Sequence, residues 1–273
     1  MGNLNFGKYS APETLKQLID LQADLHQKRL LPYEDLLGYY FSNDEVGERY
    51  LNTPVDLISF ARPGMDGIHY GFLTDFGLVE DLENAYIVRV SPMDFDDPVK
   101  IVAWNLRDFM RMLCYAPASL NLLDISSNQV YCKEVGHEDS NILEDVSTLH
   151  VRTIFRDTFQ LEPMNDIYSY LKSVKDERTK EIVVPTNDGV GVVNNISNTM
   201  EHPAFDLNRD SSLEIDKVKF FLEGVPPEAK LAFIRDVQSF GLVFDNDEVK
   251  AYFRDQLLLL NLPDEAERIM FEV

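Results

Sequence analysis

Apolar residues at helical spacing predict two helices at the start of the chain. Between residues 15 and 25, leucine and isoleucine recur every three or four positions, which is typical of one buried helix face. Ser10 and Glu13 have the spacing of a capping box, and Pro12 suits the first turn. Similar intervals predict a second, short helix over residues 32–41.

Residues 54–115 show a pattern of strands that ends in a helix. Short runs rich in β-branched and aromatic residues are separated by turn-forming glycine and proline. Asn105 is a suitable helix cap, and a helix is predicted over residues 106–115. The predicted strands cover residues 57–61, 68–73, 86–90 and 99–103. Because the strands are grouped with helices at either end, we expect an α+β fold with a mixed sheet flanked by helices.

The second half of the chain is predicted to be mainly α-helical. Asn165 or Asp166 can cap one of its helices, and Pro263 begins the last one. The predicted helices cover residues 140–160, 167–174, 213–222, 227–240 and 247–262, with a short one from residue 263. The final helices have the brief connections of a small helical bundle.

Between these helices the sequence predicts a hairpin and a loop. Residues 182–184 and 190–193 are apolar runs around an Asn-Asp-Gly turn, and residues 194–210 are rich in Asn, Asp and Ser. We therefore divide the chain into an α+β domain over residues 1–115 and a helix-rich region over residues 116–273.

The chain is strongly acidic, with 25 basic and 47 acidic residues and a formal net charge of −22. The charge is evenly spread: −8 over residues 1–115 (10 minus 18), −8 over 116–210 (8 minus 16) and −6 over 211–273 (7 minus 13). Binding to nucleic acid or to an anionic membrane needs clustered lysine and arginine, so neither is expected. The acidic surface instead favours a basic protein partner.

Composition and cysteine content favour the cytoplasm. Hydrophobic residues make up 45% of the chain, enough to bury a core rather than remain disordered. The first residues lack the basic and apolar segments of a signal peptide, and no apolar run approaches the roughly 18 residues of a membrane span. The two cysteines, Cys114 and Cys132, do not form a disulfide framework, which suits a reducing compartment.

The sequence contains no familiar catalytic motif. The five histidines form no His-Glu-x-x-His pattern, and neither a P-loop nor a Gly-x-Ser-x-Gly motif occurs. Residues 94–97 offer carboxylates to a divalent cation, but flanking prolines favour a solvated loop. Residues 245–248 begin like a calcium loop, but Val249 and Lys250 replace the required ligand and glycine, so Asp247 is interpreted as a helix cap. We expect no metal and no cofactor.

Two neighbouring segments resemble a known superfamily. Residues 54–61 contain a phenylalanine-alanine strand, and residues 64–71 (Gly-Met-Asp-Gly-Ile-His-Tyr-Gly) contain a glycine turn and an aromatic strand. With a Leu-Pro pair before them and the helix that begins at residues 105–110, they resemble the SUKH superfamily over roughly residues 10–115. This group includes Smi/Knr-type fungal regulators and bacterial toxin-immunity proteins. The resemblance implies an α+β domain that binds other proteins, in bacteria often a basic toxin.

The glycine turn and the proline-bracketed loop supply the candidate partner-binding residues. These residues are Asp66, His69, Tyr70, Asp94, Asp96 and Asp97. We expect them to give acidic and aromatic recognition of a protein at the edge of the sheet, as in a non-enzymatic immunity protein. Two alternatives remain: a hydrolase or transferase with Asp66 or Asp94 beside His69 in a cleft, and a scaffold that self-associates through its helical half.

Overall fold

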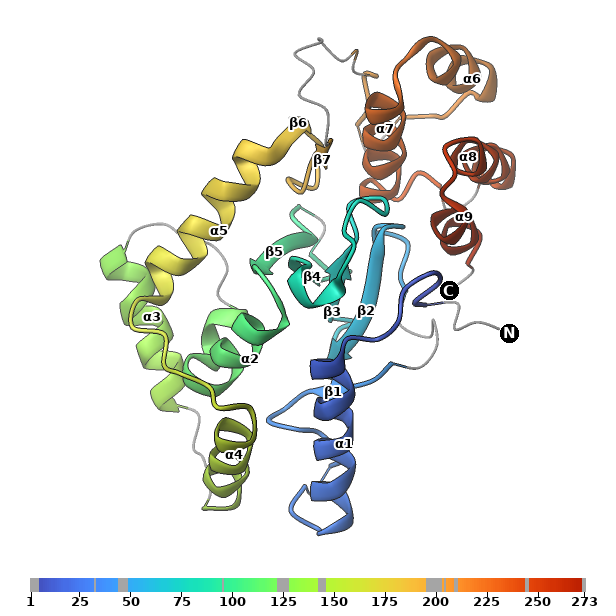
Figure 1. Cartoon of the computed structure of the whole chain (residues 1–273). Coiled ribbons are helices and arrows are strands. Elements are labelled where there is room, and N and C mark those ends of the chain that lie inside the picture. Colours follow the sequence, from blue (N-terminus) through green and yellow to red (C-terminus); the bar gives the residue numbers. More distant parts are fainter. Residues whose placement is uncertain are drawn as a thin grey trace.

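The chain folds into an α+β architecture (Figure 1). The computed structural model describes residues 5–31, 33–43, 49–94, 96–121, 128–141, 146–194, 203, 205–208, 211–243 and 246–271. A five-stranded sheet occupies the N-terminal part, and the C-terminal region is mostly helical apart from one hairpin. The predicted fold class is therefore confirmed.

The sheet is a meander in which every strand pairs with the next. Its strands are β1 (Tyr40–Phe41), β2 (Leu57–Arg62), β3 (His69–Leu73), β4 (Ile87–Val90) and β5 (Val99–Ala103). They lie in the order β1-β2-β3-β4-β5, so β3 is central and β5 is an edge. Every pairing is antiparallel, so the sheet is not mixed as expected, because each connection returns the chain beside the strand it has just left.

Two helices, α1 (Glu13–Gln27) and α2 (Leu106–Tyr115), pack with the sheet in one core. Aromatic rings fill that core: Phe60 stacks on Phe72 with ring centroids 4.4 Å apart, and Phe109 meets Tyr70 at 5.0 Å. Burying each phenylalanine contributes about 1.5–3 kcal/mol relative to leaving it exposed. The core thereby fixes the central strand, which carries two of the predicted site residues.

The two helices begin in different ways. Asn105 caps α2 as predicted, since its Oδ1 accepts a hydrogen bond from the backbone N–H of Asp108 at 2.9 Å. The capping box predicted for α1 is wrong, because Pro12 occupies the cap position and forms no side-chain cap bond. Instead, Glu83 accepts a hydrogen bond from the backbone N–H of Thr14 at 2.9 Å. A residue distant in sequence replaces the local cap.

The short helix predicted over residues 32–41 is wrong for the described part of that range, which excludes residue 32. Glu34, Leu37 and Gly38 have φ angles of 66°, 56° and 86°, in the left-handed region that a right-handed helix cannot contain. Asp35 Oδ1 accepts a hydrogen bond from the backbone N–H of Gly38 at 2.7 Å and closes a tight turn. This turn leads directly into β1.

The remaining elements follow the predicted pattern, with one α-helix and two short 3-10 helices added among the described residues. They are two short 3-10 helices (Leu82–Asn84 and Pro117–Leu120), α3 (Asn128–Asn141), α4 (Val146–Phe159), α5 (Ile167–Glu181), β6 (Ile182–Val184), β7 (Val192–Val193), α6 (Ile215–Gly224), α7 (Pro227–Ser239), α8 (Asp247–Leu259) and α9 (Pro263–Ile269). Helix α3 was not predicted, and α4 covers only part of the helix expected over residues 140–160. Residues 142–145 and most of 194–210 lie outside the described chain.

Capping side chains distinguish the predicted helix starts. Asp166 caps α5, since its Oδ1 accepts a hydrogen bond from the backbone N–H of Ser169 at 2.9 Å. The cap of α8 is Asn246, whose Oδ1 accepts from the backbone N–H of Val249 at 3.1 Å, so the prediction of Asp247 as the cap is wrong by one residue. Asp247 lies inside the first turn, where its charge favours the helix dipole.

Two main apolar clusters organise these elements. The first combines the sheet, α1 and α2 with side chains from α3, α4 and α5, including Tyr131, Phe155 and Leu171. The second lies among α6–α9 and is joined by Val55 and Phe76 from the sheet region. Residues on both sides of position 115 therefore share a core. None of the helices in the described residues is both long and apolar enough to cross a membrane.

Candidate functional site

His69 lies in the core, fully buried on β3. Its ring Nδ1 lies 2.8 Å from the Gly67 carbonyl oxygen, which can only accept, so Nδ1 carries the hydrogen and Nε2 accepts from the Thr53 hydroxyl at 3.1 Å. The ring also stacks on Tyr50 at 5.8 Å. Burial lowers the pKa of His69 from 6.5 to about 4, so the imidazole is neutral and both nitrogens are occupied.

Tyr70 is also fully buried. Its hydroxyl donates a hydrogen bond to the Leu120 carbonyl at 3.1 Å, and its ring packs 5.6 Å from that of Tyr39. Burial raises the pKa of Tyr70 well above 10. The structure therefore corrects the expectation for His69 and Tyr70: both lie on the central strand rather than at a sheet edge, and neither side chain reaches the surface.

The glycine turn before β3 separates an exposed carboxylate from the buried histidine. Gly64, Asp66 and Gly67 have φ angles of 77°, 51° and 67°. A Cβ at Gly67 would lie 2.6 Å from Cζ of Tyr50, so a larger residue there would require the Tyr50 ring to shift and would also be strained by the positive φ. Asp66 is exposed while His69 is enclosed, so the carboxylate–histidine cleft required by the hydrolase or transferase alternative is not formed.

The sheet topology brings the acidic candidates to one end of the sheet. In an antiparallel meander the β2–β3 and β4–β5 turns lie at the same end, and His69 at the start of β3 faces Val90 at the end of β4. We call Asp66, Asp94, Asp96 and Asp97 the acidic rim. Asp94 is half-buried and the other three are exposed.

The loop that carries three of these aspartates is held by its own hydrogen bonds. The backbone N–H of Ser91 donates to the Pro98 carbonyl at 2.7 Å, and the backbone N–H of Asp97 donates to Asp94 Oδ1 at 3.3 Å. Within the described residues, no group of three or more His, Cys, Asp or Glu side chains is arranged to hold a metal ion. The chemical property of the rim that can bear on binding is therefore its negative charge.

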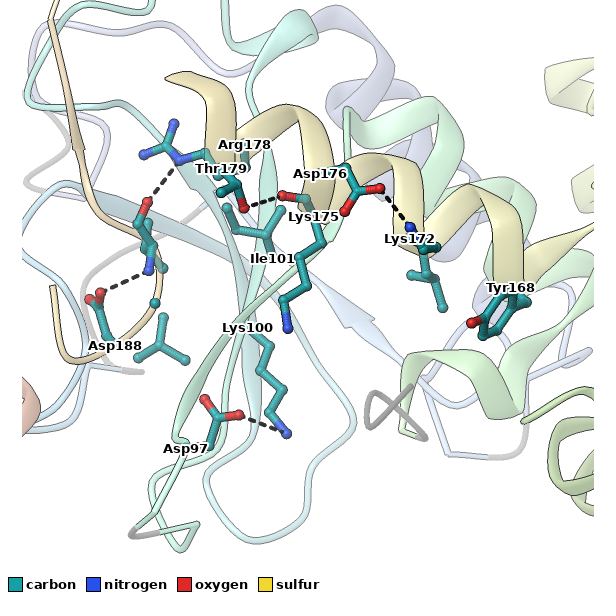
Figure 2. A pocket seen from close by; sticks show the side chains of 14 residues that line it. Asp97, Lys100, Ile101, Tyr168, Lys172, Lys175, Asp176, Arg178, Thr179 and Asp188 are labelled. Carbon is teal, nitrogen blue, oxygen red and sulfur yellow. Dashed lines mark hydrogen bonds and ion pairs between the residues drawn. The ribbon is translucent and has the colours of Figure 1, made fainter. Parts of the chain in front are cut away.

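A groove of about 590 Å³ lies between α5 and the edge strand β5, next to the acidic rim (Figure 2). One wall is the β5 segment, with Val99, Lys100 and Ile101. The other is one face of α5, on which residues recur at intervals of three and four. The residues of that face are Tyr168, Leu171, Lys172, Lys175, Asp176, Arg178 and Thr179. The hairpin turn at residues 188–190 closes one end.

The charged side chains that line the groove nearly balance, with four basic ones (Lys100, Lys172, Lys175 and Arg178) and three acidic ones (Asp97, Asp176 and Asp188). Lys100 pairs with Asp97 of the rim at 3.3 Å, and Lys172 pairs with Asp176 at 2.9 Å. Lys175 is exposed, and its ammonium makes no hydrogen bond or ion pair with the described residues. Figure 2 shows the Lys100 and Lys175 side chains in the space between β5 and α5.

Buried arginines lie behind the groove and join the two halves of the chain. Arg178 of α5 donates to both carboxylate oxygens of Asp75, at 3.0 and 2.6 Å, and to the Val190 carbonyl at 2.8 Å. Arg235 of α7 donates to Asp56 and to the Gly191 carbonyl. The contact of Arg178 with Asp75 is bidentate, whereas Arg235 makes single bonds and its buried Nε has no hydrogen-bond partner among the described residues.

Asp188 belongs to the same buried network and reaches the groove. Its Oδ2 lies 3.8 Å from Nε of Arg235, and its Oδ1 accepts a hydrogen bond from the backbone N–H of Val190 at 3.0 Å. Burial raises the pKa of Asp188, although the neighbouring Arg235 acts in the opposite direction. We did not predict this network from the sequence, because its members are far apart in the chain.

Two further arginines fasten backbone segments. Arg268 of α9 donates to the carbonyls of Val55 and Asn5, at 3.1 and 2.9 Å. Arg49 donates to the carbonyls of Leu57 and Pro54, at 2.8 and 2.7 Å. The C-terminal helices are thus tied to the first residues of the chain and to the segment before β2.

No protein-family model matches the chain, and no curated protein matches it either. The SUKH resemblance therefore remains a prediction. The groove and the buried arginines lie largely outside the segment on which that resemblance depends.

Proposed function

We propose that the protein is a cytoplasmic, non-enzymatic interaction module whose acidic rim binds a basic protein. The observation that carries this proposal is the placement of Asp66 with Asp94, Asp96 and Asp97 at one end of the sheet. Three of the four side chains are exposed, and the loop that bears most of them is held by hydrogen bonds within the loop, from Ser91 N–H to the Pro98 carbonyl and from Asp97 N–H to Asp94 Oδ1.

The chemistry of this rim suits charge-steered association. Exposed carboxylates on a chain of net charge −22 attract a cationic surface over a Debye length of about 10 Å at 0.1 M salt. Charges of this kind act mainly on the association rate and on partner choice. The SUKH resemblance makes a basic bacterial toxin the first partner to test, in which case the protein would act as its immunity protein.

Affinity purification from the source cells tests the proposal. The tagged wild type is compared with D66N/D94N/D96N, which removes three rim charges and leaves the Asp97–Lys100 pair in place. Asparagine tolerates the left-handed backbone of position 66 and preserves the acceptor oxygen of position 94. We expect the wild type to retain a basic protein that is released as salt rises, and the triple variant to lose it.

A matched control separates the rim from total charge. The variant D20N/D255N/E267Q neutralises three exposed carboxylates on α1, α8 and α9, away from the rim. It should retain the partner as the wild type does. Recovery of no protein partner at low and moderate salt, or equal loss in both triple variants, would contradict the proposal. Sedimentation of the purified chain tests the alternative of self-association, which would show as a species larger than the monomer.

A further inference from the structure

The outer edge of β5 presents backbone hydrogen-bonding groups to the groove. Strand β5 pairs only with β4 among the described strands. The Pro98 carbonyl accepts from Ser91 on the β4 side, and backbone groups of successive strand residues alternate between the two sides. Val99 and Ile101 therefore direct their N–H and C=O groups towards α5, and no described hydrogen bond joins α5 to either residue.

Helix α5 closes this edge at one end only. At the end of β5, the backbone N–H of Trp104 donates to the hydroxyl of Tyr170 at 3.1 Å, and the two rings meet at 5.3 Å. Towards residues 97–101 side chains of both elements line open space instead. The α5 face from Tyr168 to Thr179 extends for about 17 Å at ~1.5 Å per residue, the length of about five residues of an extended strand.

The groove walls define the chemistry of an occupant. Leu171, Ile101 and Val190 provide apolar surface. Three ammonium groups also line the groove, of which Lys100 and Lys172 are paired with Asp97 and Asp176, while that of Lys175 is not paired with any described residue. Lys175 has no carboxylate partner among the described residues, so an occupant with carboxylates gains an ion pair without displacing an existing one. An open strand edge beside a helix is a setting in which peptides bind by adding a strand.

We propose that this groove binds an extended acidic peptide segment of a partner protein, which adds a strand to β5 and places carboxylates against Lys100, Lys172 and Lys175. The site shares Asp97 with the acidic rim but does not include Asp66, Asp94 or Asp96, and its backbone contribution comes from the β5 edge. Each site can therefore be lost without the other.

Fluorescence anisotropy with synthetic peptides tests the strand contact. The probe is a labelled eight-residue peptide of alternating valine and glutamate, and two isomers carry N-methyl groups on either all four valines or all four glutamates. Amides of alternate residues point to the same side of a strand, so only one isomer blocks pairing with β5. We expect one isomer to bind at least about tenfold more weakly than the parent, as the loss of hydrogen bonds implies, and the other to bind much like the parent.

Variants on α5 test the charge contact. K175E should lower the affinity for the parent peptide by about tenfold or more. K180E makes the same charge change on α5 outside the groove and should leave the affinity nearly unchanged. An unlabelled peptide with lysine in place of glutamate should not displace the labelled parent peptide from the groove. Circular dichroism confirms that both variants fold.

Several results would overturn the inference. Equal binding by the two N-methylated isomers would show that no strand pairs with β5, and equal weakening by K175E and K180E would show only long-range attraction. The variant D66N/D94N/D96N should bind the peptide as the wild type does. If the protein fails to bind the peptide but retains the basic partner, the groove proposal is wrong and the proposed function is supported. If it binds the peptide but retains no basic partner, the proposed function is wrong and the groove proposal is supported.

Discussion

The charges between the two apolar clusters and the charges around β5 differ in residue type, partners and exposure. The interior set consists of arginines such as Arg178 and Arg235, each bound to an aspartate and to backbone carbonyls. The surface set consists of lysines and aspartates, of which Lys175 has no partner among the described residues. The first set is fully enclosed, and the second lies on the groove and the rim.

This difference follows from the chemistry of arginine and lysine side chains. A guanidinium presents several donors in a fixed plane, so it can satisfy a carboxylate and carbonyls together when water is excluded. An ammonium on a flexible stem keeps its hydration and can exchange partners at the surface. We infer that the interior charges fix how the C-terminal helices dock on the sheet, and that the surface charges are available for binding.

Replacing Arg235 should have the largest effect on stability. R235M leaves Asp56 and Asp188 buried without their shared cation, and removing one partner of a buried pair costs about 3–5 kcal/mol. Urea denaturation followed by circular dichroism measures the loss. The control R254M, on the partly exposed Arg254, should change stability by less than about 0.5 kcal/mol. Equal effects would remove the contrast between interior and surface.

The pH dependence of stability should report the buried His69. Its pKa is lowered from 6.5 to about 4, so the folded state binds fewer protons than the unfolded state between these values. The stability is therefore present above pH 6.5 and is lost as the pH falls towards 4, by up to about 3 kcal/mol. Denaturation of the wild type and H69Q in steps across this window measures it, and H69Q should show the flatter slope.

Asp236 contributes a slope of the opposite sign. Burial raises its pKa from 3.8 to about 6, so its contribution to stability falls as the pH rises through this range. The same measurement on D236N, alone and combined with H69Q, separates the two groups. A wild-type slope that H69Q leaves unchanged would contradict the enclosed position of His69.

The turn that joins exposed Asp66 to buried His69 should tolerate alanine poorly. At Gly67, alanine combines a φ of 67° with a Cβ 2.6 Å from the Tyr50 ring, and we expect a loss of about 2 kcal/mol. Gly189 has a φ of 71° but open space around it, so G189A should cost only about 1 kcal/mol of backbone strain. Thermal and urea unfolding compare them, and equal losses would mean that Tyr50 moves aside freely.

The smallest effect on stability should come from the lysine most important for the groove. Lys175 has no partner among the described residues, so K175E should change the free energy of unfolding by less than about 0.5 kcal/mol. The same substitution should weaken the binding of the acidic peptide. The same denaturation series checks this. A large loss of stability would mean that Lys175 supports the fold. The surface charges would then not differ from the buried arginines in their effect on stability.

Local patterns predicted most of the elements and failed where tertiary contacts decide. Four strands of the sheet and most helices follow from apolar spacing and turn residues, because those signals act within a few positions. The helix expected over residues 32–41 gave way to a turn with positive φ at Leu37. Apolar spacing cannot distinguish the turn from a helix, because the same side chains can reach the core from both. The cap supplied to α1 by Glu83 was equally invisible to local sequence.

The candidate site was predictable only in its charges. Asp66 and the loop at residues 94–97 were found from turn chemistry and acidity, and the meander topology explains why they lie together. His69 and Tyr70 looked accessible beside a turn, but both faces of β3 are covered. The groove depends on Lys175 approaching β5 from a helix more than sixty residues later, a pairing that no local motif encodes.

The contacts of Arg268 and Asp264 have a consequence for how the protein is made. Arg268 binds the Asn5 carbonyl, and Asp264 accepts a hydrogen bond from the backbone N–H of Lys8 at 2.7 Å. The ribosome adds Arg268 to the chain 263 residues after Asn5, so this contact forms only once α9 has been made. Until then the segment around Asn5 lacks these two contacts and is held by others, such as the hydrogen bond from Asn5 Nδ2 to the Ser59 carbonyl at 2.7 Å. The docking of this N-terminal segment is thus tied to the synthesis of α9.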